Sequence, residues 1–189
     1  MPGELDQEFE ELFRDPGSLR RGRFRYLPVA PGRLEFAFEV RQAILRELPR
    51  VVAVELPVTL REAYLRAVAR LPEITVLLYP DDQDAERGIY VPVEPADPFT
   101  EAIRSGLEIG AQILFADPDL GERPHLPDRY PDPYSIRRIP LEKYVEAYRV
   151  YPQPRSDAIA AHAAGIAWKL EGTGPLDQVL VVLSLNLLD

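Results

Sequence analysis

Residues 51–57 read Val51-Val52-Ala53-Val54-Glu55-Leu56-Pro57, an apolar, β-branched run that ends in a carboxylate beside a proline. Two later runs repeat this pattern, since residues 89–98 carry Glu94 and Asp97 beside prolines and residues 113–119 lead into Asp117. Short apolar runs that alternate with helical patterns predict an α/β fold with a mostly parallel sheet. Ligands of such sheets collect beyond the carboxyl ends of the strands, so we expect these acids to converge on one edge.

The three most continuous apolar runs are expected to be central parallel strands, covered by helices on both faces. They are residues 51–56, 112–116 and 179–185. Further strands are predicted over 24–29, 74–79 and 89–93, and the short connection between the last two allows a hairpin. Helices are predicted over 34–48, 59–71, 98–109, 135–150 and 156–171, the second capped by Thr59 in a capping box with Glu62. The predicted class is therefore a three-layer α/β fold whose mostly parallel sheet is mixed by one hairpin.

The length of 189 residues, with 46% hydrophobic residues, is enough for one sizeable core. Residues 1–20 are expected to form an acidic N-terminal helix and linker, because apolar residues recur at helical spacing over residues 4–14. Residues 21–189 are expected to form a single α/β domain. The sequence ends directly after a predicted buried strand, which suggests a longer parent chain.

Composition argues against several classes of partner and location. The net charge of −9 disfavours nucleic-acid binding. Four arginines lie within residues 20–25, and a solvent-exposed loop explains them more simply than a nucleic-acid-binding patch does. The absence of cysteine excludes disulfides and thiol chemistry. The sequence contains neither an apolar run of about 18 residues nor the basic start of a signal peptide. We therefore expect a cytoplasmic protein that binds neither a membrane nor nucleic acid.

Four acids are candidate catalytic residues. Glu55 ends an apolar strand, where a carboxylate needs a solvated crevice or a partner. The structural alternative is that it accepts hydrogen bonds from the backbone amides at the start of the next helix. Glu94 and Asp97 lie three residues apart, and Asp97 also suits the N-cap of the next helix. Asp117 follows another predicted strand, although a plain turn would also explain it. Such a group could perform acid–base chemistry or hold a hard cation.

Four further residues are candidate ligand-binding residues. Gly32 and Arg33 lie in the turn after the first predicted strand, which lacks the glycine pattern of a nucleotide-binding loop. Arg155 precedes an alanine-rich helix and could bind an anionic ligand. His125 lies in the proline-rich segment 118–133, and loops of this length are often functional.

The order of elements resembles the superfamily that contains the TraB/PrgY, Tiki, ChaN and erythromycin-esterase-like domains, over roughly residues 24–185. The matching segments are a strand and turn (26–32), two strands that end in acids (52–57 and 113–117), an arginine that opens an alanine-rich helix (155–167) and a final valine-rich strand. The resemblance implies a metal-dependent hydrolase with a histidine in the first turn and a second after the last strand. This chain has no histidine near Gly32 and reads Leu183-Ser184-Leu185-Asn186 at the second position.

We therefore predict a catalytically degenerate α/β domain that needs no cofactor and binds a protein partner or a small ligand at an acidic sheet edge. The alternative is a metal-dependent hydrolase in which Glu55, Glu94, Asp97 and Asp117 hold Mg²⁺ or Mn²⁺ or act as general bases. The sequence leaves the partner, the substrate and the oligomeric state open.

Overall fold

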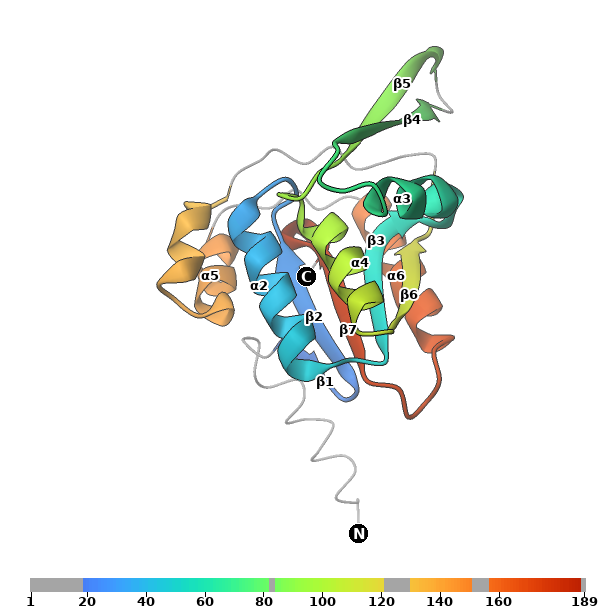
Figure 1. The fold of residues 1–189 in the computed structure, drawn as a ribbon. Coiled ribbons are helices and arrows are strands. Elements are labelled where there is room, and N and C mark those ends of the chain that lie inside the picture. Colours follow the sequence, from blue (N-terminus) through green and yellow to red (C-terminus); the bar gives the residue numbers. More distant parts are fainter. Residues whose placement is uncertain (1–18, 82–83, 121–129, 151–156, 188–189) are drawn as a thin grey trace.

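The computed structural model describes residues 19–81, 84–120, 130–150 and 157–187, without the side chains of residues 79–87 (Figure 1). The predicted N-terminal helix lies outside these ranges. The strands are β1 (Arg20–Arg21), β2 (Phe24–Val29), β3 (Val51–Pro57), β4 (Thr75–Asp81), β5 (Asp84–Val93), β6 (Gln112–Asp117) and β7 (Val179–Ser184). The α-helices are α2 (Leu34–Glu47), α3 (Arg61–Val68), α4 (Pro98–Glu108), α5 (Leu141–Arg149) and α6 (Asp157–Glu171). Three 3₁₀ turns are η1 (Val58–Leu60), η2 (Pro133–Arg137) and η3 (Leu185–Leu187).

Five strands form one sheet in the order β1-β2-β7-β3-β6. β2, β7, β3 and β6 are parallel, with Val54 opposite both Val182 and Phe115, whereas β1 is antiparallel to β2. The last strand of the chain, β7, therefore lies at the centre of the sheet between β2 and β3. The central positions predicted for residues 51–56 and 179–185 are confirmed.

β6 lies at the edge of the sheet, so the central position predicted for residues 112–116 is wrong. Helices pack closely on both of its faces. A Cβ on Gly106 of α4 would lie 2.6 Å from Cδ1 of Ile113, and one on Gly165 of α6 would lie 2.5 Å from Cβ of Pro118. An edge strand between two helices is as apolar as a central one, which is why the sequence pattern does not separate them.

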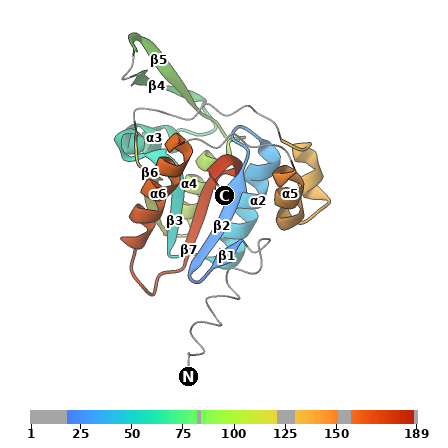
Figure 2. The same ribbon diagram turned by 180° about the vertical axis from the view of Figure 1, so that it is seen from behind.

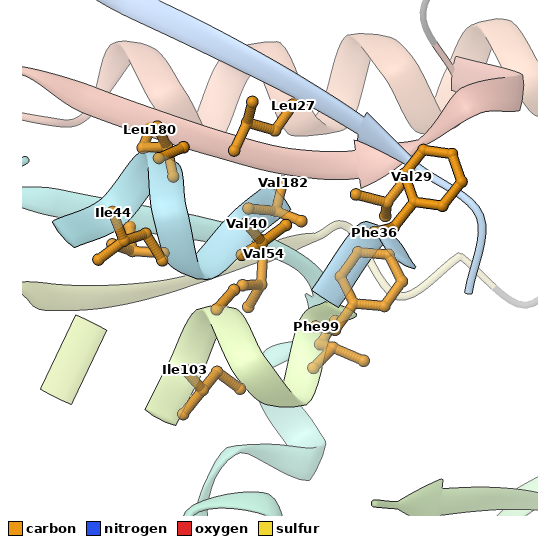
Figure 3. Close-up of a cluster of buried hydrophobic side chains, with 14 of the residues drawn as sticks. Leu27, Val29, Phe36, Val40, Ile44, Val54, Phe99, Ile103, Leu180 and Val182 are labelled. Carbon is orange, nitrogen blue, oxygen red and sulfur yellow. The ribbon is translucent and has the colours of Figure 1, made fainter. Parts of the chain in front are cut away.

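The layers are those of a three-layer α/β fold. α2 and α4 cover one face of the sheet, and α6 covers part of the other (Figures 1 and 2). The larger core lies under α2 and α4, where Val40 and Ile44 of α2 lie close to Leu180 and Val182 of β7 (Figure 3). Ile103 of α4 belongs to the same cluster. The smaller core on the α6 face is built around Ile166 and Leu170.

The predicted hairpin is confirmed, but β4 and β5 form a separate two-stranded sheet instead of joining the main one. It projects beyond the carboxyl ends of the parallel strands (Figures 1 and 2). Val93 is buried in the larger core, and Leu77 and Val91 pack against it. In the part of the chain that the structure describes, one face of the hairpin is therefore covered by the body of the domain.

Two predicted helices differ in detail. Thr59 lies in η1, where its Oγ1 donates to Oδ2 of Asp119 at 2.8 Å, so the predicted capping box is wrong and α3 begins without a side-chain cap. Residues 135–150 are not one helix, because Pro140 lacks a backbone N–H and separates η2 from α5.

Candidate functional site

The carboxyl ends of β2, β7, β3 and β6 meet at one edge of the sheet because these strands are parallel. Glu55 and Asp117 lie at the ends of the neighbouring strands β3 and β6, where Pro57 is paired with Asp117. Asp97 precedes α4, and Gly32 lies in the turn after β2. The structure therefore brings these four predicted residues to the same end of the fold.

Glu55 is half-buried and stabilises the end of the central strand β7. Its Oε2 accepts a hydrogen bond from the backbone N–H of Ser184 at 2.5 Å. The structural role expected for this carboxylate was to bind amides of the following helix. It binds an amide of the neighbouring strand instead, a contact that only the order of strands in the sheet creates.

Asp97 is buried and joins α4 to the turn after β2. Its Oδ1 accepts from the N–H groups of Phe99 and Thr100 at 3.0 and 2.9 Å, so its predicted role as N-cap is confirmed. Its Oδ2 accepts from the N–H of Gly32 at 3.0 Å. Burial raises the pKa of Asp97, and these backbone donors oppose that shift. The carboxylate thus uses both oxygens for contacts within the chain.

Gly32 is suited to its turn because its φ of +67° belongs to the left-handed region that favours glycine. Its N–H is directed at Asp97, so the turn binds a carboxylate of its own chain. The neighbouring Arg33 is exposed and supplies no side-chain cap to α2.

Asp117 is 4% exposed and lies against α6. Its Oδ1 accepts from the N–H of Asp119 at 2.7 Å and lies 3.4 Å from Nε2 of His162. Nζ of Lys169 donates to the backbone carbonyl of Asp117. These contacts attach the end of β6 to one face of α6.

His162 was not among the predicted site residues, yet it is 3% exposed and its Nδ1 has no hydrogen-bond partner within the described ranges. The sequence does contain a signal. His162 and Lys169 are seven residues apart and therefore share a helix face, and Gly165 between them lets that face approach Pro118.

Among the described residues, one further predicted acid does not join this arrangement. Glu94 is half-buried, and the contacts of the described chain do not connect its carboxylate to the other acids. His125 and Arg155 lie outside the described residues. Glu101, one turn along α4 from Asp97, belongs to a separate, partly buried cluster with Arg41, Arg104 and Ser105 that joins α2 to α4.

The positions of the acids can be compared with the alternative in which they hold Mg²⁺ or Mn²⁺. Within the ranges that the structure describes, no three His, Asp or Glu side chains lie close enough together to hold a metal ion. The same part of the chain contains no helix that is long and apolar enough to cross a membrane. Glu55, Asp97 and Asp117 thus share an edge of the sheet, but each one bonds to a different partner.

Comparisons with protein-family models, with curated proteins and with solved structures found no match to this chain.

Proposed function

We propose that this chain is a catalytically degenerate, hydrolase-like α/β module that binds a protein partner at the carboxyl edge of its sheet and on the adjoining β4–β5 hairpin. The observation that carries this proposal is the outer face of the hairpin. Val76, Leu78 and Tyr90 are 53%, 68% and 71% exposed, and Pro92 is also exposed. A projecting apolar face of this kind is typical of a protein-interaction surface.

These four side chains form one continuous surface because of the hairpin register. Val76 is paired with Pro92, and Leu78 with Tyr90, so two cross-strand pairs lie side by side on one face. The opposite face carries Leu77, Val91 and Val93, which pack on the core. The core anchors the hairpin and leaves its outer face available to a partner.

Binding is expected through this face more than through strand addition. Among the described strands, β4 and β5 pair only with each other, so each has a free outer edge. Pro80 in β4 and Pro92 in β5 lack the N–H that an added strand needs. An aromatic residue beside aliphatic ones is the composition of a binding hot spot. The partner is therefore expected to contribute its own apolar side chains.

The carboxylates support a module without catalysis. Asp97 uses both oxygens to organise backbone, Asp117 bonds to Asp119 and lies against His162, and Glu55 accepts from Ser184. A metal-dependent hydrolase with Mg²⁺ or Mn²⁺ needs carboxylate oxygens that converge on one point. These contacts direct the acids to backbone amides and to a buried histidine.

The test is site-specific photo-crosslinking in the native cells, with a photoreactive phenylalanine analogue at Tyr90 and, as the control, at Leu176. Leu176 is 90% exposed and lies just before β7. It is therefore at the amino ends of the parallel strands, whereas the hairpin projects beyond their carboxyl ends. A protein that is cross-linked from position 90 and not from 176 is then purified. The variants Leu78→Ser and Tyr90→Ser should each weaken its binding by about tenfold or more, and Leu176→Ser should not. Equal binding by all the variants would contradict the proposal.

A further inference from the structure

We propose that residues 4–14 of this chain dock into a groove on the α6 face of the sheet. No described residue of the β4–β5 hairpin lines this groove, and the inference does not depend on the proposed protein partner. Figure 2 shows α6 over one side of that face, and no described helix lies across β2 there. The groove has a volume of about 220 Å³. Its lining includes Leu19, Arg21, Tyr26, Ala163, Ile166 and Leu183.

The chemistry of the groove is apolar with a cationic component. Ile166 of α6 and Leu183 of β7 supply aliphatic walls, and Tyr26 of β2 contributes a partly buried ring. Arg21 lines the groove together with Tyr26. Burial raises the pKa of the Tyr26 hydroxyl, and the positive charge of Arg21 opposes this shift. Arg149 of α5 also lines the groove. A matching occupant would carry apolar side chains on one face and acids on the other.

Residues 4–14 have this composition. Leu5, Phe9, Leu12 and Phe13 recur at helical spacing and would form one apolar face of a helix. Glu4, Asp6, Glu8, Glu10 and Glu11 are the acids of the same segment, and Arg14 is its single cation. The charge of the segment is thus opposite to that of the arginines in the groove.

The covalent connection to the groove supports the same occupant. Leu19 itself lines the groove, so the segment that precedes it is tethered beside it. The connection consists of Asp15-Pro16-Gly17-Ser18, a turn-forming sequence whose four residues reach at most about 14 Å. A helix over residues 4–14 would be about 16 Å long. A tether this short gives an effective concentration on the order of millimolar, so weak apolar contacts suffice for docking.

The absence of cysteine makes disulfide trapping a clean test in the full-length chain. The docked pair is Phe9→Cys with Ala163→Cys, and the matched control is Gln7→Cys with Ala163→Cys, because Gln7 lies on the opposite side of the predicted helix. Under mild oxidation we expect the docked pair to form an intramolecular disulfide about tenfold faster than the control or more. Ala167→Cys, on the same wall of the groove, replaces Ala163→Cys if the latter variant does not fold.

Two outcomes would overturn the proposal. Equal rates for the Phe9 and Gln7 variants would show that the segment does not present its apolar face to the groove. Disulfide-linked dimers in place of cross-linked monomers, separated on a non-reducing gel, would assign the groove to a second copy of the chain.

Discussion

The carboxylate of Glu55 accepts a hydrogen bond from the backbone N–H of Ser184, a residue 129 positions later in the chain. This bond joins the end of β3 to the end of β7, the two strands at the centre of the sheet. An acid that follows an apolar strand is often interpreted as catalytic. In this fold a carboxylate at that position can also accept a hydrogen bond from a backbone N–H of the neighbouring strand.

Substitution of Glu55 separates these two roles. Glu55→Gln retains an oxygen acceptor for the Ser184 N–H, so it should lower the free energy of unfolding by about 1 kcal/mol or less. Glu55→Ala leaves the amide without its acceptor and should cost about 1–3 kcal/mol. Urea unfolding of both variants measures the difference. Equal losses for Gln and Ala would show that the hydrogen bond does not stabilise the fold.

Removal of the Asp97 side chain should have a larger effect, because it accepts from three backbone amides. Asp97→Ala is expected to cost about 3 kcal/mol or more, from a lost helix cap and unsatisfied N–H groups near the core. Asp97→Asn keeps one acceptor for α4 but places an amide donor against Gly32, so its cost should be intermediate. A cost for Asn as large as that for Ala would contradict this assignment of contacts.

Asp97 also predicts a pH dependence. Burial raises the pKa of Asp97 from its ordinary value of 3.8, so the folded state holds the proton to higher pH than the unfolded state does. The stability linked to this group is then fully present below the unfolded pKa and is lost as pH rises through the folded pKa. The stability difference between wild type and Asp97→Asn should be largest in acid and shrink as pH rises. Paired urea titrations at several pH values measure it, and a difference that widens with pH would refute the assignment.

Gly165→Ala tests the contact between α6 and the end of β6. Alanine normally stabilises a helix by up to about 1 kcal/mol over glycine. Here the added Cβ would lie 2.5 Å from Cβ of Pro118, so α6 must shift and we expect a loss of about 1–3 kcal/mol. Ala164→Ser, at an exposed neighbouring position, is the control and should change stability by less than about 0.5 kcal/mol. A stabilising Gly165→Ala would place α6 further from the sheet than the structure has it.

Local sequence patterns predicted most of the helices and strands, because the spacing of apolar residues and the position of turn residues depend on neighbours that are close in the sequence. They did not predict the position of β6, since burial under α4 and α6 gives an edge strand the composition of a central one. They placed Asp97 at its helix cap but missed the bond from Asp97 to Gly32, which depends on how α4 packs beside the turn after β2. His162 was missed for the same reason, because only the packing of α6 on β6 brings it to Asp117.

We propose that the acids at the carboxyl ends of the parallel strands stabilise the fold and do not hold a catalytic metal ion. The most direct test is the metal content of wild type and Glu55→Gln, each purified without chelator and dialysed against Mg²⁺ and Mn²⁺. Elemental analysis should find much less than one bound ion per chain in both proteins. One divalent ion per wild-type chain that is lost in Glu55→Gln would contradict the claim and favour the hydrolase alternative.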